Sequence, residues 1–309
     1  MRNLTVDRGL SVTADDTLNL RIAVVIPSLG RPVEVGQLIA ALERQTYPPH
    51  IIILSVTEGA DLPSPLPSSI EVVVGPKGSC AQRNLAISLV IDRCDVIAFF
   101  DDDYLPARSA LEGIAKLFAA NPDVVGADGQ LLADGIGTAG LSYEEAQRII
   151  EAFDRDGLKG KQTTFDTFGL YGCNMAFRAS AIDGVRFDEN LPLYGWQEDI
   201  DFASRLCARG RVIKTNAFAG VHRGVKRGRT SGLRFGYSQV INPLYLVKKR
   251  TMPARYAYKL ILKNVGANHA RIFWPEPWVD RWGRVRGNWW ALWHALTGRI
   301  DPRLMLELS

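Results

Sequence analysis

Four short runs rich in β-branched residues alternate with stretches of helical periodicity over the first hundred residues, and this alternation limits the folds open to the chain. The expected strands are RIAVVIP (21–27), PPHIIILSV (48–56), IEVVVG (70–75) and DVIAFF (95–100), with helices over 33–45 and 79–92. Short connections between them predict an α/β fold with a mostly parallel, doubly wound sheet flanked by helices. In such sheets ligands bind beyond the carboxyl ends of the strands.

The rest of the 309-residue chain divides into a continuation of this domain and a tail of different composition. Further helices are expected over 108–122, 142–153 and 198–210, strands over 123–132 and 211–217, and two short strands around a glycine turn within 164–180. We expect a polar lead-in at 1–20, one α/β domain at 21–230, and a basic, tryptophan-rich, mostly helical extension at 231–309.

Charge is unevenly distributed along the chain. From His222 to the end there are 17 Lys and Arg against 4 Asp and Glu, whereas residues 1–221 hold 20 against 29. A basic tail suits anions such as nucleotide phosphates or acidic lipid headgroups. It contains no recognisable nucleic-acid-binding motif, so we expect no nucleic-acid partner.

Nothing in the sequence indicates export or a membrane span. Residues 1–16 lack the apolar segment of a signal peptide, and no stretch reaches 18 uninterrupted apolar residues. The four cysteines, Cys80, Cys94, Cys173 and Cys207, form neither a CxxC pair nor a zinc-ligand spacing. We therefore expect a cytoplasmic protein whose cysteines are reduced and lie in or near the core.

Three consecutive aspartates, Asp101, Asp102 and Asp103, directly follow the apolar run DVIAFF. Adjacent carboxylates repel one another, and partial burial makes the repulsion more costly. A divalent cation would relieve it, because hard ions such as Mg²⁺ prefer oxygen ligands and are held by one or two carboxylates with substrate phosphates. The alternative is a solvated acidic turn, and the apolar residues on both sides argue against it.

Three further groups are candidates for function. Glu198 and Asp199 begin an expected helix, where the helix dipole alone favours acids, but where a carboxylate could also act as a general base beside the aromatic ring of Trp196. His222 precedes a basic run and could complete a metal shell, or it could be an ordinary histidine. Arg83 could face a nucleotide at the strand ends, or it could be a surface residue of its helix.

Five segments together resemble family 2 glycosyltransferases with the GT-A fold. They are VIPSLGRP (25–32), QRNLAI (82–87), FFDDD (99–103), GCNMAFR (172–178) and GWQEDIDF (195–202), within a resemblance that covers roughly residues 20–230. The resemblance implies transfer of one sugar from a nucleotide-sugar donor to an acceptor hydroxyl, with inversion at the anomeric carbon, in polysaccharide or glycolipid assembly. It also implies Mg²⁺ or Mn²⁺ as cofactor and a carbohydrate or lipid-linked acceptor.

The resemblance assigns roles to individual residues. The aspartate motif maps onto residues 101–103, with Asp103 as metal ligand and Asp101 and Asp102 beside the nucleotide-sugar, and His222 matches a later metal ligand. The acid pair maps onto Asp199 as catalytic base and Glu198 in support of it or in contact with acceptor. The other expected contacts are Pro27, Ser28, Gly30, Glu58 and Arg83 for the nucleotide-sugar, and Tyr194 and Trp196 for the acceptor.

Two departures from the family pattern matter. The family often has an Asp pair after the second strand, against the nucleobase, whereas Thr57 and Glu58 stand there in this chain, which leaves the base open. The QxxRW motif of the processive synthases is absent and no membrane-spanning run follows, which indicates a non-processive enzyme.

Two other functions are compatible with such a fold. A sugar-nucleotide pyrophosphorylase should have a glycine-rich loop with a basic residue directly after the first strand, and PSLGRP is poor in glycine. A non-catalytic relative that only binds nucleotide-sugar should lack one of the acid motifs, and both are present.

The tail allows two interpretations. Arg, Lys and Trp together suit a lipid–water interface, so the enzyme could sit peripherally on the inner face of the cell membrane. Alternatively, residues 231–309 pack on the catalytic domain, with their tryptophans in the core or in an acceptor cleft.

Overall fold

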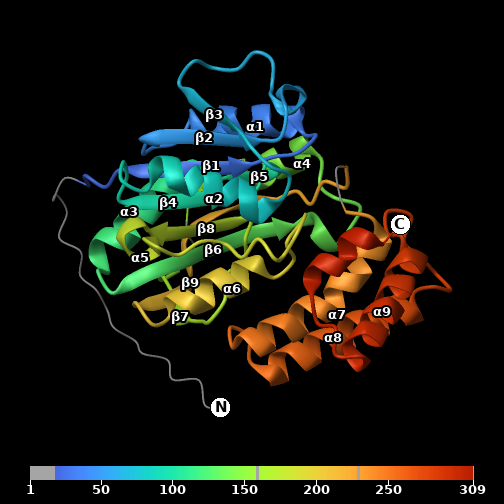
Figure 1. Cartoon of the computed structure of the whole chain (residues 1–309). Coiled ribbons are helices and arrows are strands. Elements are labelled where there is room, and N and C mark those ends of the chain that lie inside the picture. Colours follow the sequence, from blue (N-terminus) through green and yellow to red (C-terminus); the bar gives the residue numbers. More distant parts are fainter. Residues whose placement is uncertain (1–17, 158–159, 228–229, 309) are drawn as a thin grey trace.

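The structure, a computed structural model, describes residues 18–157, 160–227 and 230–308. Within these ranges nine strands form one sheet with helices on both faces, and the last three helices stand together beside it (Figure 1). The strands are β1 (Ile22–Pro27), β2 (Ile51–Val56), β3 (Ile70–Val74), β4 (Val96–Phe100), β5 (Tyr104–Pro106), β6 (Val124–Asp134), β7 (Thr164–Asp166), β8 (Asn174–Arg178) and β9 (Arg211–His222). The helices are α1 (Pro32–Leu42), α2 (Ser79–Val90), α3 (Ala110–Ala120), α4 (Tyr143–Asp156), α5 (Ala179–Ile182), α6 (Glu198–Leu206), α7 (Gly232–Lys249), α8 (Ala254–Ala270) and α9 (Arg281–Leu296).

The strand order confirms the expected α/β fold with a mostly parallel sheet. The order is β3-β2-β1-β4-β8-β6-β9-β5, with β7 paired to β9. Strands β1 to β4 run parallel to one another, and β6 and β9 run the same way on the far side of the antiparallel β8. The chain reverses its direction of winding between β1 and β4, which is where a ligand crevice forms in sheets of this kind.

Both faces of the sheet are buried, which explains why the parallel strands are apolar throughout. Alternate residues of β1 face opposite sides, with Val24 packed in the layer that holds α1 and α3, and Val25 in the layer that holds α2 and α6. Two features were not expected: the short strand β5 directly after the aspartates, and the extension of β9 as far as His222.

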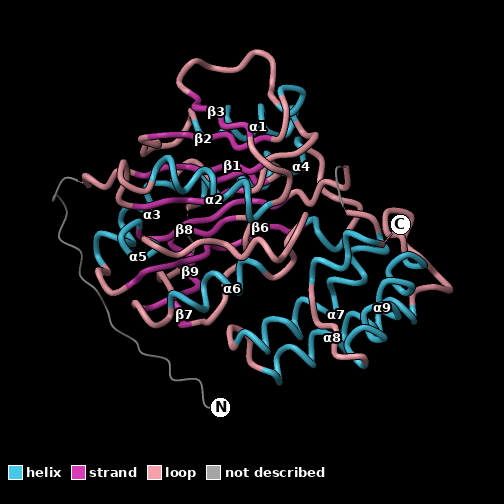
Figure 2. Tube along the Cα trace, viewed as in Figure 1, coloured by secondary structure: helices cyan, strands magenta, loops and turns pink. Residues whose placement is uncertain are grey.

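The tail is helical, as expected (Figure 2). Its first helix, α7, contributes residues to two cores. Leu246 of α7 packs in the same layer as α2 and α6, whereas Tyr237 packs with α8 and α9. The buried Asp201 of α6 also pairs with Lys249 at the end of α7, at 2.8 Å. Helix α7 therefore packs on the catalytic domain and carries the other two helices.

Helices α7 and α9 approach each other through glycines. A Cβ atom at Gly236 would overlap the backbone oxygen of Arg284, and one at Gly287 would overlap the backbone oxygen of Leu233. With no side chain between them, the two backbones are in direct contact.

Two sequence expectations can be checked at this level. No helix within the described ranges combines the length and the apolarity that crossing a bilayer requires. All four cysteines are free thiols, and Cys80, Cys94 and Cys173 are buried as expected, but Cys207 is exposed because it lies just after the last residue of α6.

Candidate active site

The aspartate run lies where two neighbouring parallel strands end. Strands β1 and β4 pair with Val25 beside Phe99, so the residues that follow both strands share one edge of the sheet. Ser28, after β1, donates from Oγ to Oδ2 of Asp102 over 2.7 Å.

The three carboxylates are not a solvated turn. Asp102 and Asp103 are only 6% and 3% exposed, whereas Asp101 is partly exposed. Each has its own cationic partner: Arg83 for Asp101 at 3.0 Å, Arg31 for Asp102 at 2.8 Å and His222 for Asp103 at 3.4 Å. The repulsion that the sequence predicts is therefore relieved by side chains of the protein.

Burial and these partners shift the pKa values of the cluster in different directions. Burial raises the pKa of Asp102, and the charge of Asp103 adds to this while Arg31 opposes it. Burial would also raise the pKa of Asp103, but its hydrogen bond to His222 and the charge of that imidazole lower it to about 2. Burial would lower the pKa of His222, but hydrogen bonds to Asp103 and Asp134 raise it to about 10. A metal ion entering the cluster would therefore displace a proton.

Three side chains converge in a way that fits a divalent ion. Asp101, Asp103 and His222 each bring one potential ligand atom, and these atoms lie within 4.8 Å of one another. Two carboxylate oxygens with one imidazole nitrogen suit Mn²⁺, and the oxygens also suit Mg²⁺. Asp134, at the end of β6, lies 2.8 Å from Nδ1 of His222 through Oδ1, which leaves Nε2 facing Asp103. A carboxylate of this kind behind a histidine is typical of metal sites.

Arg83 connects the aspartate motif to the acid pair. It comes from α2, is 2% exposed, and donates to Oδ1 of Asp101 over 3.0 Å and to Oε1 of Glu198 over 2.6 Å. The two motifs, almost a hundred residues apart in the sequence, therefore lie on either side of one guanidinium. Arg83 is therefore buried between the two motifs, paired with one carboxylate of each, and is not a surface residue of its helix.

Asp199 is held at the start of α6 by backbone donors. Its Oδ2 accepts from the N–H of Gly172 and its Oδ1 from the N–H of Ile200, both over 2.8 Å. Burial and the neighbouring charge of Glu198 raise the pKa of Asp199 to about 7, although the two N–H groups oppose the shift. A fixed carboxyl group that titrates near neutrality is suited to accept a proton.

The turn before α6 has an uncommon backbone. Leu193 and Gln197 adopt positive φ angles of 58° and 79°, in the region that non-glycine residues rarely visit. Between them lie Tyr194, which is exposed, and Trp196, whose ring is 5.8 Å from that of Phe235 on α7. The tail therefore forms one wall beside the residues expected to contact an acceptor.

The turn after β1 lies next to the end of β2. Pro27 ends β1, and Gly30 adopts a positive φ of 67° at a place where a Cβ atom would meet nothing within 4 Å. The N–H of Gly30 donates over 2.6 Å to Asp61, which is 1% exposed and also accepts from Thr57. Glu58 is exposed at the start of the same short helical turn.

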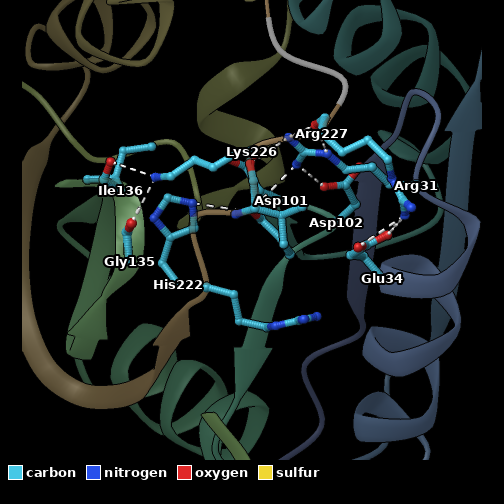
Figure 3. A network of polar contacts seen from close by, with 12 residues as sticks. Arg31, Glu34, Asp101, Asp102, Gly135, Ile136, His222, Lys226 and Arg227 are labelled. Atoms are coloured by element: carbon cyan, nitrogen blue, oxygen red, sulfur yellow. Dashed lines mark hydrogen bonds and ion pairs between the residues drawn. The ribbon is translucent and has the colours of Figure 1, made fainter. Parts of the chain in front are cut away.

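The basic loop after β9 is tied down over the aspartates (Figure 3). The N–H of Val225 donates to Oδ2 of Asp103 over 2.7 Å, and Arg31 donates to the backbone oxygens of Val225 and Arg227 while also holding Asp102. Lys226 donates to the backbone oxygens of residues 135 and 136. The positive charge of this loop is thus partly engaged within the protein, and Arg229, expected to belong to it, lies outside the described residues.

Three residues of this site were not singled out from the sequence: Arg31, Asp61 and Asp134. Arg31 lies inside the quoted segment VIPSLGRP, so its charge beside three acids was an available signal. Asp61 follows Glu58 by three residues, a spacing typical of helix capping. Asp134 follows an expected strand and carries no local signal, because its partner His222 is far away in the sequence.

A family profile described as glycosyl transferase family 2 matches residues 23–186. None of the curated proteins searched matches the chain. The matched range includes the aspartate motif and ends before Glu198, Asp199 and His222.

Several solved structures share the fold. The mannosyltransferase PcManGT from Pyrobaculum calidifontis, in complex with GDP-Man and Mn²⁺, is 15% identical with a TM-score of 0.51, over 94% of this chain and 79% of that one. TarS 1–349 of S. aureus is 12% identical with a TM-score of 0.50, over 92% of this chain and 89% of that one. GalNAc-T7 with UDP, GalNAc and Mn²⁺ is 12% identical with a TM-score of 0.50, over 85% of this chain and 59% of that one.

The family profile covers more than half of the chain, from β1 to beyond α5. The matched residues include Ser28, Arg83 and the three aspartates, which meet at the strand ends. The chain therefore belongs to glycosyl transferase family 2, as a glycosyltransferase with the GT-A fold.

Proposed function

We propose that this protein transfers one sugar from a nucleotide-sugar to an acceptor hydroxyl, with inversion and without processivity, in polysaccharide or glycolipid assembly. The observation that carries the proposal is the contact of Arg83 with both acid motifs, because Asp101, which we expect beside the donor, and Glu198, which we expect beside the acceptor, share one guanidinium. A protein that only binds nucleotide-sugar would not need a fixed carboxyl group with a pKa of about 7 at Asp199.

Asp103 and His222, with Asp101 nearby, are the residues that would hold Mn²⁺ or Mg²⁺. Such an ion, when bound, supplies positive charge that stabilises the departing diphosphate. The imidazole nitrogen favours Mn²⁺ of the two. Asp134 orients His222 for this task by accepting from Nδ1.

The donor would lie along the ends of β1, β2 and β4. Pro27, Ser28 and Gly30 form the turn that approaches it, and Glu58 stands at the nucleobase end in place of the family's more common aspartates. Asp101 and Asp102 complete this side, together with Arg83, which holds Asp101 by a hydrogen bond. Asp61 holds the β1 turn against β2 through Gly30 and Thr57.

Asp199 would take the proton of the acceptor hydroxyl as its oxygen attacks the anomeric carbon. The N–H groups of Gly172 and Ile200 fix the direction of the carboxylate, which leaves its remaining lone pairs for the acceptor. Trp196 and Tyr194 offer aromatic faces for the acceptor sugar, and Glu198 supports the site through Arg83.

The test is a donor screen combined with a variant of Asp199. Because solved structures of the same fold contain GDP-Man or UDP, we would begin with GDP- and UDP-sugars in Mn²⁺ or Mg²⁺, and measure thermal stabilisation and sugar transfer. Asp199→Asn should keep the stabilisation by donor and lower kcat by about 10²–10⁴-fold. The wild-type rate should rise as pH rises through about 7, since the protonated carboxyl group cannot accept a proton.

The matched control is Asp92→Asn, which changes an exposed aspartate after α2 and should leave both readouts unchanged. Near-normal transfer by Asp199→Asn would retire the assignment of the base. Failure of every nucleotide-sugar to stabilise the wild-type protein would contradict the proposed function itself. The anomeric configuration of the product, determined by NMR, decides between inversion and retention.

A further inference from the structure

The tryptophans of the tail lie on the surface of the protein. Their exposed fractions range from 40% to 82%, at positions Trp274, Trp278, Trp282, Trp289, Trp290 and Trp293. Tryptophan is usually highly buried, and clusters of exposed apolar side chains mark interaction sites. The interpretation that these tryptophans fill the core is therefore wrong, although α7 does pack on the catalytic domain.

Helix α9 presents a broad apolar surface on the side that faces away from α7. Its inner side, with Val285, Asn288 and Ala291, is buried. At about 100° per residue, the exposed side chains fall within one stripe about 120° wide. These residues, which we call the aromatic face, are Trp282, Arg286, Trp289, Trp290, Trp293 and Leu296.

The aromatic face carries positive charge. Arg286 lines a surface pocket of about 460 Å³ together with Trp289, Trp290 and Trp293. Residues 254–308 hold nine Lys and Arg against four Asp and Glu. Three of these four acids already have partners within the tail. Glu276 pairs with Arg271 and Arg281, and Asp301 pairs with Arg303. Asp280 accepts a hydrogen bond from the N–H of Gly283. The charge that the tail offers to a partner is therefore positive.

The aromatic face and the acceptor side of the site are linked through α7, which contacts Trp196 on one side and α9 on the other. Phe235 of α7 contacts the ring of Trp196, and Asn242 of α7 donates to the backbone oxygen of Trp196 over 2.9 Å. Helix α9 packs on the same α7 through Gly236 and Gly287. Figure 1 shows α7, α8 and α9 grouped together beside the sheet. The aromatic face is the outer side of this group, and α7 is the helix that joins the group to the acceptor turn.

We propose that the aromatic face of α9 docks on the headgroup layer of an anionic lipid bilayer and holds the protein there peripherally. Indole rings prefer the interface between headgroups and acyl chains, and arginine is drawn to anionic headgroups. A second copy of the chain is the less suitable occupant, because a two-fold contact would place the positive charges of the two aromatic faces against each other. The docking does not depend on the sugar-transfer reaction.

The test is co-flotation of the full chain with vesicles of phosphatidylcholine, with and without phosphatidylglycerol. We expect binding to the anionic vesicles, with tryptophan fluorescence quenched by brominated acyl chains. The triple variant Trp282→Gln, Trp289→Gln, Trp293→Gln should bind at least about tenfold more weakly, because it removes the apolar contact. Arg286→Gln should weaken binding about fivefold, on anionic vesicles alone.

The matched control is Phe165→Gln, which removes an exposed aromatic ring from β7 of the catalytic domain and should leave binding unchanged. Because all the substituted residues are exposed, circular dichroism and the melting temperature should match those of the wild-type protein. Wild-type protein that stays soluble with both kinds of vesicle, or a triple variant that floats as well as wild type, would overturn the proposal. If sedimentation shows that the wild-type protein is a dimer and the triple variant a monomer, the aromatic face binds a second copy of the chain, and the proposal is overturned.

Discussion

The carboxyl edge of the sheet and the outer side of α9 depart from the usual distribution of residues in opposite directions. At the edge, Asp102, Asp103 and His222 are charged groups that the fold buries. On α9, large apolar rings that folding normally hides are left in contact with water. Folding alone would favour neither arrangement, so each difference points to something outside the chain that the region contacts.

The two regions also differ in how they are held. The buried charges are held by many specific partners, with each acid matched to an arginine, a histidine or a backbone N–H. The aromatic face is held from behind, by the close contact of α9 with α7. Breaking a charge partner should therefore affect stability and the site together, whereas changing the aromatic face should affect only binding.

The strongest test of this comparison is Arg83→Met. The substitution leaves Glu198 buried without its charge partner, so we expect the free energy of unfolding to fall by about 3–5 kcal/mol. Chemical denaturation measures it. The control is Arg93→Met, which removes an exposed arginine paired with Glu71 and should cause little loss. Equal effects of the two substitutions would show that the buried pair is no more important to the fold than the exposed one.

A smaller effect is expected at Asp134, which touches no substrate in our proposal. Asp134→Ala removes the acceptor from Nδ1 of His222 and should weaken Mn²⁺ binding about 10–100-fold, measured by calorimetry without donor. Asp134→Asn keeps an acceptor oxygen and should lose less affinity. If both variants bind Mn²⁺ with the affinity of the wild type, Asp134 does not orient His222 for metal binding.

The smallest effect is expected at the contact between α7 and α9, which supports α9 without forming part of its aromatic face. Gly236→Ala places a methyl group against the backbone of Arg284 and should lower the free energy of unfolding by about 1–3 kcal/mol. Gly266→Ala, in open space on α8, should instead raise it by up to about 1 kcal/mol. Thermal melts of the two variants give the comparison. If Gly236→Ala leaves the free energy of unfolding unchanged, the two helices can move apart at little cost, which contradicts a tight contact.

The strands and helices of the catalytic domain were largely predictable, because apolar periodicity and turn residues act locally. The positions of β1, β4 and α2 follow from such signals, and with them the meeting of Ser28, Arg83 and the aspartates. The pairing of β5 with β9 is a contact between distant segments, so the meeting of Asp103 with His222 had to be taken from family resemblance.

Other parts could not be derived from local pattern. The sequence suggests a cation to relieve the repulsion of the aspartates, but Arg31 and Arg83 supply much of that relief from two other segments. The tryptophans of α9 recur at helical spacing, which suits a core face as well as an exposed one. Only the packing of α7 against Val285 and Ala291 decides which side of α9 is outside.

The glycine contact between α7 and α9 has a consequence for geometry. At Gly236 and Gly287 no side chain separates the two backbones, so the angle of α9 relative to α7 is set there by main-chain atoms. Because α7 also contacts Trp196, the angle between the indole rings and the acceptor turn depends on this helix crossing. One added methyl group at Gly236 or Gly287 would change that angle without altering any residue of the candidate site.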